Sequence, residues 1–512
     1  MGQYVIGIDA GGTMTKAGLF DLAGVEIACA HSRNVMQAPH PGWTERDPDG
    51  MWQAATVAVR EVLERSGISP SEIEAVSVAG YGGGLYLLDR DAHPVRHGIM
   101  STDARTIDII TEWQSNGTAD QVEALIGQHL WAGQTFVLLA WLARNEPGVL
   151  DRTYRVSFCK DFLRAQLCGD MSTDLTDAGS AGLLDPDTGT YCDALLELLG
   201  LVHLRDKLPE LGPSDEVVGR VTAKAAALTG LQEGTPVVRG TVDMSAAALA
   251  SHISKPGQMS VVAGTFSIAS TLNTTPRRSY VPMLQFPYPL GGYMAVEGSP
   301  TSASNLEWVV KTVLAQGQPL PNEGFSDIYE RLNEALARRL GKPGPALFFP
   351  FLFGGPDGAP AGLLGMTAQS GFDDMAIAIF EGIVFAHKLD IDKVLSGDDA
   401  APVDLIRLTG GATRSPYWSK LFADILGLPI EVPTGSEFGA LGVAICAASA
   451  IGAYPSLADA VAGMTGIARR HDCNAERHAA HIAKFPRFVA MAHAMAAIPA
   501  VPSVTETEAC YA

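Results

Sequence analysis

Basic residues are scarce in this sequence of 512 residues. It contains 36 Lys and Arg against 56 Asp and Glu, which gives a formal net charge of −20 at pH 7. Proteins that bind nucleic acid or anionic membranes depend on clusters of Lys and Arg. The charge therefore argues against both kinds of partner, and an anionic ligand would have to be held by a few local groups.

Cysteine pairs and long apolar runs are also lacking. The seven cysteines are widely spaced and include no CxxC pair, so neither a disulfide framework nor a zinc site is indicated. The twelve histidines show no metal-ligand spacing. No stretch reaches the roughly 20 apolar residues that span a bilayer, and the N-terminus has no basic segment followed by a long apolar run. We expect a protein of the reducing cytoplasm.

The chain is longer than one hydrophobic core can fill, so we expect two domains. Apolar positions from Pro48 to Arg65 recur at helical spacing, and the apolar strand IEAVSVAG follows. The segment TPVVRGTVDMSAAALASHI then predicts a strand, a turn and a helix. Such alternation is typical of layered α/β lobes.

The first candidate for chemistry is a glycine-rich turn near the N-terminus. YVIGIDAGGTMTKAGLF predicts two strands joined in a hairpin. Glycines let backbone N–H groups approach phosphate, hydroxyls add donors, and a carboxylate at a strand end suits hydrated magnesium. The candidate residues are Asp9, Gly11, Gly12, Thr13, Thr15 and Lys16. A dinucleotide-binding unit would continue as a helix after Lys16, so the predicted strand argues against an oxidoreductase. An ordinary hairpin turn is the alternative.

Three further features have matching chemistry. MSVVAGTFSIAS, around Gly264 and Thr265, repeats the strand, turn and strand of the N-terminal hairpin and suggests an internal duplication. LIRLTGGATRSPYWSKL runs from a strand through Gly410, Gly411 and Ala412 into a helix, a geometry suited to a nucleotide. Asp243 follows the strand VVRGTV and could accept a hydroxyl proton in phosphoryl transfer. Capping of the next helix is the alternative role for Asp243.

In this order the features resemble the FGGY family of carbohydrate kinases over roughly residues 4 to 450. The resemblance includes GWTERDP, STDAR, KDFLRAQLCGDMSTDLTDAG, TVDMSAAAL, EGIVFAH and EFGALGVA. It implies an α/β fold of two actin-like lobes, the ribonuclease H-like fold of the hexokinase, Hsp70 and actin superfamily, with an ATP cleft between them. Residues 1–248 would form the lobe with the sugar site and first phosphate loop, and residues 249–512 the lobe with the second phosphate loop and adenosine site.

The resemblance also implies roles and cofactors. ATP and Mg2+ would be required, with Asp9 near the magnesium ion and Asp243 as the catalytic base. Gly11, Gly12, Thr13, Thr15 and Lys16 would belong to the first phosphate loop, Gly264 and Thr265 to the second, and Gly410, Gly411 and Ala412 to the adenosine turn. The sugar would lie near Tyr81, Gly82, Asp103, Asp243 and Met244. A homodimer is one option for the assembly.

The identity of the sugar depends on finer differences. D-xylulose kinases have a Met-His pair where this chain has Gly82 and Gly83, and an Asn where it has Met244. GLYLLDRDAHPVRHGIMSTDAR and ALFFPFLFGG look most like the branch that phosphorylates L-xylulose and 3-keto-L-gulonate. That branch usually has Gln and Lys near positions 81 and 83, where this chain has Tyr81 and Gly83. L-xylulose is the leading expectation, with D-xylulose, erythritol or another polyol as alternatives.

A non-catalytic ATPase switch of the actin and chaperone kind is the alternative from a different class. Two sets of side chains have undecided roles. Glu297, Ser299, Ser302 and Asn305 either line a site or, as we favour, serve as helix caps and turn residues. Trp131, Trp141 and Trp308 are expected in the core rather than against a sugar.

Overall fold

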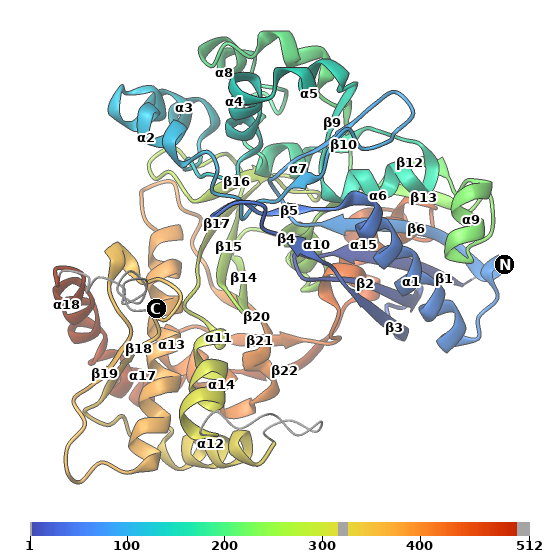
Figure 1. The fold of residues 1–512 in the computed structure, drawn as a ribbon. Coiled ribbons are helices and arrows are strands. Elements are labelled where there is room, and N and C mark those ends of the chain that lie inside the picture. The colour runs from blue at the N-terminus through green and yellow to red at the C-terminus, as the bar shows by residue number, and fades with distance from the viewer. Residues whose placement is uncertain (1–2, 316–325, 499–512) are drawn as a thin grey trace, which may run out of the picture.

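Two mixed β-sheets form the framework of the computed structural model, which describes residues 3–315 and 326–498 (Figure 1). The first sheet has the order β12-β13-β6-β1-β2-β3. Its strands are β1 (Tyr4–Ala10), β2 (Met14–Asp21), β3 (Glu26–Arg33), β6 (Ile73–Gly80), β12 (Val217–Arg220) and β13 (Pro236–Val242). The predicted N-terminal hairpin is confirmed, because β1 pairs antiparallel with β2.

The second sheet repeats this arrangement. Its order is β16-β17-β15-β14-β20-β21-β22. The strands are β14 (Gln258–Ala263), β15 (Ser267–Asn273), β16 (Leu284–Pro287), β17 (Tyr293–Ser299), β20 (Leu405–Gly410), β21 (Ile430–Pro433) and β22 (Ile467–His471). In each sheet an antiparallel hairpin (β1–β2 or β14–β15) lies beside two parallel strands and a final antiparallel strand. The expected internal duplication and the actin-like fold class are therefore confirmed.

Helices cover the sheets where the apolar periodicity predicts them. In α1 (Pro48–Ser66), the side chain of Asp47 accepts from the backbone N–H of Asp49 and Gly50, and Gly67 ends the helix at φ 66°. Such a left-handed C-terminal residue is the common glycine stop signal. Other helices of the two lobes are α6 (Cys159–Cys168), α10 (Asp243–Ala250), α12 (Ser326–Arg339), α13 (Phe372–Val394), α14 (Pro416–Leu426) and α15 (Phe438–Ala450).

The helix α15, which is rich in small residues, packs closely against β1 and α10 of the N-terminal half of the chain. A Cβ atom on Gly7 of β1 would lie 1.9 Å from the carbonyl oxygen of Ala440. A Cβ atom on Gly442 would lie 2.0 Å from the carbonyl oxygen of Ala246 in α10. These two glycines therefore allow α15 to contact β1 and α10 directly. The division of the chain after residue 248, near the end of α10, stays a prediction.

The remaining helices and strands surround the two sheets. Helices α2 (Ile107–Ser115), α3 (Thr118–Ile126), α4 (Thr135–Asn145), α5 (Pro147–Arg152) and α8 (Asp193–Leu198) gather at the top of Figure 1 around their own apolar core. The others are α7 (Leu175–Ser180), α9 (Ala223–Thr229), α11 (Ala303–Trp308), α16 (Leu457–Met464), α17 (Ala475–Ile482) and α18 (Phe485–Ala496). Short strands are β4 (Met36–Gln37), β5 (Glu45–Arg46), β7 (Tyr86–Leu88), β8 (Gly98–Ile99), β9 (Arg155–Ser157), β10 (Thr173–Asp174), β11 (Leu211–Gly212), β18 (Leu347–Phe349) and β19 (Gly362–Leu364).

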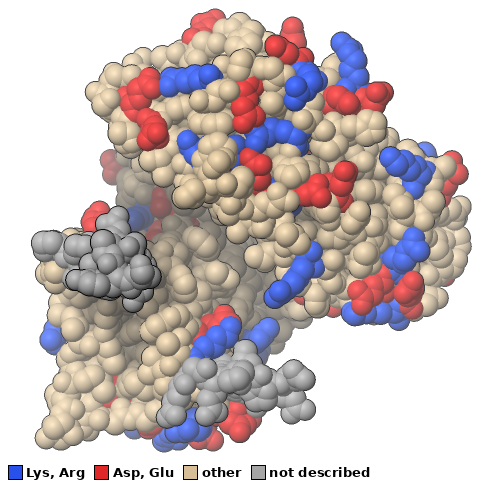
Figure 2. All heavy atoms as spheres, viewed as in Figure 1, with Lys and Arg blue, Asp and Glu red and all other residues tan. Residues whose placement is uncertain are grey.

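The surface agrees with the charge argument made from the sequence. Figure 2 shows acidic and basic side chains interspersed over one face, with a hollow between the upper and lower parts of the molecule. Within the described ranges, no helix has the length and apolar character needed to cross a membrane. The six cysteines in those ranges are free thiols, and Cys510 lies outside them.

Candidate active site

The first glycine-rich loop lies between β1 and β2 and is held from behind by two side chains. Arg46 is buried and donates to the carbonyl oxygen of Gly12 and, at 3.2 Å, to that of Gly11. Asn34 donates from Nδ2 to the same Gly11 oxygen at 3.0 Å. These hydrogen bonds fix the carbonyl oxygens of Gly11 and Gly12 on the protein side of the loop. Neither side chain was identified as a candidate, although Arg46 lies inside the GWTERDP block.

Some residues of this loop are exposed, whereas others are buried and stabilise the loop. Gly12 and Thr13 are exposed. Thr15 is buried, and its hydroxyl donates to Oδ1 of Asn34 at 3.1 Å, so it supports the loop; its contact with a phosphate stays a prediction. Lys16 is partly exposed, and its Nζ lies 2.9 Å from Oε2 of Glu437 at the start of α15.

Asp9 lies near the end of β1 and faces the first turn of α15. A Cβ atom on Gly439 would lie 2.3 Å from Oδ2 of Asp9, so only glycine leaves room for this carboxylate. Oδ1 of Asp9 is buried and has no hydrogen-bond partner among the described residues. Burial raises the pKa of Asp9 to about 6, although Lys16 opposes the rise. A buried carboxylate oxygen without a protein partner is a suitable ligand for a hard cation or one of its waters.

Asp243 begins α10 directly after β13. The capping interpretation is wrong, because Val242 occupies the N-cap position and no side chain caps this helix. Instead, Oδ1 of Asp243 accepts from the adjacent backbone N–H of Met244 at 2.7 Å. Burial and the nearby charge of Asp9 raise the pKa of Asp243 to about 7. A carboxylate with a pKa near neutrality is suited to accept a proton from a hydroxyl group.

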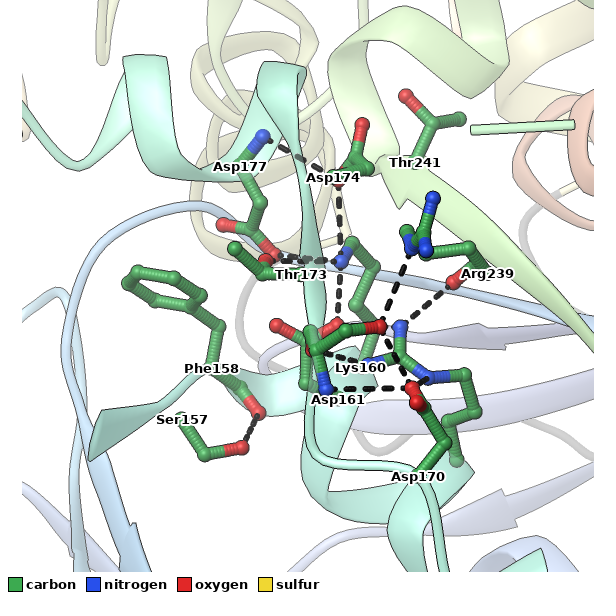
Figure 3. Close-up of polar contacts among 12 residues, drawn as sticks. Ser157, Phe158, Lys160, Asp161, Asp170, Thr173, Asp174, Asp177, Arg239 and Thr241 are labelled. Carbon is green, nitrogen blue, oxygen red and sulfur yellow. Dashed lines mark hydrogen bonds and ion pairs between the residues drawn. The ribbon is translucent and has the colours of Figure 1, made fainter. Parts of the chain in front are cut away.

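A buried ionic cluster lies beside Arg239 and Thr241 of β13, the strand that precedes Asp243 (Figure 3). Nζ of Lys160 lies 2.5 Å from Asp161, 3.0 Å from Asp174 and 3.4 Å from Asp177. Arg164, also buried, contacts Asp161 at 2.7 Å and the carbonyl oxygen of Arg239 in β13 at 2.9 Å. Lys160 and Arg164 each have several partners, whereas neither carboxylate oxygen of Asp177 has a hydrogen-bond partner among the described residues, and burial raises the pKa of Asp177 well above its usual value.

Thr176 connects this cluster to the residue before Asp243. Its hydroxyl donates to Oδ2 of Asp174 at 2.6 Å and accepts from the backbone N–H of Val242 at 3.0 Å. The same oxygen lies 2.8 Å from the hydroxyl of Thr241. The end of β13 is therefore fixed by α6 and α7. The KDFLRAQLCGDMSTDLTDAG block, to which sequence reasoning assigned no role, supplies the charged side chains of this cluster.

The second glycine loop and the third turn lie side by side. β14 and β20 run parallel, with Ala263 opposite Gly410. Gly410 has a φ of 87°, and a Cβ atom there would lie 2.5 Å from the carbonyl oxygen of Ala263, so glycine is required twice over. The carbonyl oxygen of Gly264 accepts from the N–H of Ala303 at 2.9 Å, and that of Thr265 accepts from Ser304 Oγ at 2.8 Å.

A cavity of about 500 Å3 opens beside these loops. Its volume is in the range of small-molecule sites. Gly264, Thr265 and Gly411 line it, whereas Ala412 is buried, and the contact of all four residues with a nucleotide stays a prediction. The lining residues that sequence reasoning missed include Ser304, Tyr329, Asn333, Arg414 and Trp418. Trp418 lies within the SPYW segment, whereas nothing in the sequence near Tyr329 and Asn333 indicated a site.

The predicted sugar residues near β6 form a tightly packed wall. A Cβ atom on Gly82 would lie 2.7 Å from Ser180 Oγ, and one on Gly83 would lie 2.4 Å from Cη2 of Trp131. The indole of Trp131 therefore takes the space of a side chain at position 83. The buried Nε1 of Trp131 has no acceptor among the residues described. The hydroxyl of Tyr81 lies 2.8 Å from that of Tyr86, and Met244 is half-buried.

Asp103 is engaged by protein donors on both oxygens. Oδ2 accepts from the backbone N–H of Thr44 at 2.6 Å, and Oδ1 accepts from the backbone N–H of Arg105 at 2.9 Å and from its Nε at 2.8 Å. The guanidinium of Arg105 in turn lies over the ring of Trp43. Asp103 thus orders the segment around Thr44, and its contact with a sugar stays a prediction.

The remaining undecided side chains are also placed. Trp308 is 39% exposed, so the expectation of a core residue is wrong, because its position in α11 faces outward. Trp141 packs edge-on against Trp43 at 5.2 Å. Glu297 accepts from the hydroxyl of Tyr280 at 2.7 Å, and Asn305 donates to the carbonyl oxygen of Pro300 at 3.0 Å.

Comparisons with known proteins agree with this geometry. The N-terminal and C-terminal domain models of the FGGY family of carbohydrate kinases match residues 4–250 and 259–451. A probable L-xylulose kinase of Pasteurella multocida is 34% identical over 451 residues, which is 87% of this chain and 90% of that protein. The L-xylulose/3-keto-L-gulonate kinase of Escherichia coli is 34% identical over 469 residues, 90% of this chain and 91% of that one.

Solved structures have the same fold. A ligand-bound xylulose kinase from Lactobacillus acidophilus superposes with a TM-score of 0.85 at 21% identity, covering 96% of this chain and 98% of its own. A structure described as a xyloylose kinase from Brucella ovis has a TM-score of 0.82 at 26% identity, covering 96% and 99%. The chain therefore belongs to the FGGY family of carbohydrate kinases and is an ATP-dependent sugar kinase.

Proposed function

We propose that the protein phosphorylates a small uncharged ketopentose, with L-xylulose as the leading substrate, using Asp243 as the catalytic base. The observation that carries the reaction is the half-buried Asp243 carboxylate at the start of α10, whose pKa is raised to about 7. The names of the two relatives at 34% identity support the choice of sugar.

In the proposed mechanism, a primary hydroxyl of the sugar lies against Asp243. The carboxylate orients this hydroxyl and takes its proton while the oxygen attacks the γ-phosphorus of ATP in line with the departing ADP. Gly12, Thr13 and Lys16 would hold the phosphates from one side, and Gly264 and Thr265 from the other. Adenosine would occupy the cavity beside Gly411. Closure of the lobes would exclude water as a competing acceptor.

Magnesium fits the carboxylates at this site. Asp9, with its unpartnered Oδ1, would hold the ion or one of its waters, and the ion would neutralise phosphate charge. Lys16 would balance the remaining charge near Asp9, because the two residues lie opposite one another in β1 and β2.

The wall formed by Gly82, Gly83 and Trp131 favours an uncharged sugar. A buried carboxylate, such as that of 3-keto-L-gulonate, needs a cationic partner. At position 83, where the related branch has a Lys, this chain has Gly, and Trp131 fills the space. Erythritol is the second candidate, because an erythritol kinase of Brucella abortus is 28% identical over 479 residues.

A substrate panel tests the proposal. ADP release would be measured with L-xylulose, D-xylulose, L-ribulose, 3-keto-L-gulonate and erythritol, and with no sugar to give the background ATPase rate. We expect the highest kcat/KM with L-xylulose and a low background rate. A higher kcat/KM with 3-keto-L-gulonate would refute the argument from Gly83 and Trp131. A lack of stimulation by every sugar would refute the ketopentose assignment.

A further inference from the structure

A buried histidine in α13 bridges two segments that border the nucleotide cavity. The side chain of His387 is fully buried. Its Nδ1 lies 2.9 Å from the hydroxyl of Ser267, and its Nε2 lies 2.9 Å from the hydroxyl of Ser302. The ring also packs edge-on against Phe422, with 5.2 Å between centroids. One imidazole therefore contacts three separate segments of the second lobe.

Each of these contacts lies next to a part of the cavity wall. Ser267 begins β15, two residues after Thr265 of the second glycine loop. Ser302 directly precedes Ala303, which lines the cavity and donates its N–H to the carbonyl oxygen of Gly264. Phe422 belongs to α14, which also carries Trp418 in the cavity wall. His387 thus adds an indirect connection between the loop and the segment before α11 to the two direct hydrogen bonds from Ala303 to Gly264 and from Ser304 to Thr265.

The hydrogen-bond chemistry of the pair of serines matches a neutral imidazole. One ring nitrogen donates and the other accepts, while a hydroxyl can do either. Burial lowers the pKa of His387 to about 3, so the ring is neutral at any pH where the protein would work. Ser302 occupies the N-cap position of α11 but makes no side-chain cap bond, so its hydroxyl serves His387 instead of the helix. The capping role expected for Ser302 is therefore wrong.

The same face of α13 continues this support one turn later. Oδ2 of Asp390 accepts from the hydroxyl of Ser299 at 2.7 Å, and Ser299 lies 2.8 Å from the hydroxyl of Thr301. Ser299 ends β17 and Thr301 precedes Ser302, so α13 fixes the chain on both sides of Pro300. Asp390 also forms a hydrogen bond with Ser267, so His387 differs from Asp390 in that its ring joins Ser267 to Ser302, the residue before the cavity-lining Ala303.

We propose that His387 is a positioning residue for ATP, which holds the second glycine loop and the segment 301–304 at the separation that receives the nucleotide. The inference rests on the assignment of this cavity and loop to ATP in the proposed function. It predicts that loss of the two hydrogen bonds weakens nucleotide binding while the affinity for sugar, which depends on the opposite lobe, is retained.

The test compares three variants at this position. His387→Leu removes both hydrogen bonds, whereas the amide of His387→Asn reaches the place of Nδ1 and that of His387→Gln the place of Nε2. ATP would be titrated into each protein by calorimetry without sugar, and kcat and KM would be measured for both substrates. Since a hydrogen bond is worth about a factor of five, we expect the leucine variant to raise the Kd for ATP about 5- to 25-fold. The KM for sugar should change less than about twofold, and Asn or Gln should restore part of the affinity.

His481→Leu is the matched control. His481 is a second buried histidine and lies in α17. Its Nδ1 lies 2.5 Å from Oε1 of Glu381 in α13, the helix that also carries His387, and its Nε2 accepts from the N–H of Gly341, away from the cavity residues. This variant should lower Tm without changing the Kd for ATP. Ser302→Ala should weaken ATP binding in the same way as His387→Leu, and combining the two should add little.

The outcomes separate the inference from the proposed function. If the wild-type protein binds ATP and His387→Leu binds it equally well, the positioning role is refuted. An equal loss of affinity for ATP and for sugar in His387→Leu, or a loss of ATP affinity of the same size in His481→Leu, would also refute it. If the wild-type protein does not bind ATP at all, the proposed function itself fails. The calorimetric result does not depend on which sugar is correct.

Discussion

Replacing Asp243 with Asn should remove activity and, above neutral pH, make the protein more stable. The carboxylate accepts a single backbone hydrogen bond and lies near Asp9, so its charged form is poorly compensated. Were the group sealed from water, a rise of its pKa from 3.8 to about 7 would correspond to about 4 kcal/mol. Solvent reaches this half-buried side chain, so we expect a gain of about 1 to 2 kcal/mol from Asn.

The sign of this effect depends on pH. Because the pKa in the folded state is raised above that of the unfolded state, the folded protein holds the proton more tightly between about pH 4 and pH 7. The contribution of Asp243 to the free energy of unfolding is therefore lost as the pH rises through this window. Asn carries no charge, so the advantage of Asp243→Asn should be near zero at pH 4 and complete above pH 7.

Thermal scans from pH 4 to pH 8 measure this difference directly. For a lobe of this size the expected gain corresponds to a rise in Tm of about 2 to 8 °C above pH 7. Asp398→Asn, which changes an exposed carboxylate, is the control and should leave Tm nearly unchanged. In the same preparations kcat should fall about 10²- to 10⁴-fold in Asp243→Asn. A Tm difference that does not vary with pH, or activity within about tenfold of wild type, would refute the reasoning.

Three further predictions follow from the same site. The kcat/KM of the wild-type protein should fall as the pH drops below about 7, because Asp243 must lose its proton to act as a base; a flat profile between pH 5.5 and 8 would contradict this. Arg46→Lys should raise the KM for ATP about tenfold, because an ammonium group cannot hold both loop carbonyls, whereas Arg60→Lys, which contacts carbonyls of the Ala227–Leu228 segment, should not. Gly439→Ala should reduce kcat at least about tenfold by displacing Asp9, while Gly148→Ala, where a Cβ meets open space, should be neutral; equal kcat values would exclude this packing role.

The strands, the turns and the first long helix could be predicted from the sequence because each depends on residues that are close together in the chain. The strand periodicity of YVIGIDAGG and the apolar spacing after Pro48 are properties of adjacent residues, and both β1–β2 and α1 formed as predicted. Gly410 could also be singled out, because a Gly pair between a predicted strand and a predicted helix indicates a tight turn, and the structure shows a left-handed backbone there. Trp308 could not be placed in this way, since its exposure depends on which face of α11 packs inward.

The roles of polar residues near the site depended on long-range contacts. From the sequence alone, Asp103 and Thr15 could each bind a ligand. In the folded chain, Asp103 instead accepts a hydrogen bond from Arg105, and Thr15 donates one to Asn34. Arg46 reaches the first glycine loop from 34 residues away in the sequence, and Lys160 meets Asp174 only because α6 and β10 fold together. No spacing rule predicts such partners.

The sequence by itself determined the α/β class, the two glycine hairpins, the turn at Gly410 and the candidate carboxylates Asp9 and Asp243. Backbone propensity and the period of apolar residues depend on neighbouring residues, so they can be recognised in the sequence without the structure. Only the tertiary structure decided that Asp243 does not cap its helix, that Trp131 takes the space beside Gly83, and that His387 joins Ser267 to Ser302. Burial, desolvation and side-chain pairing between distant segments exist only once the chain has folded.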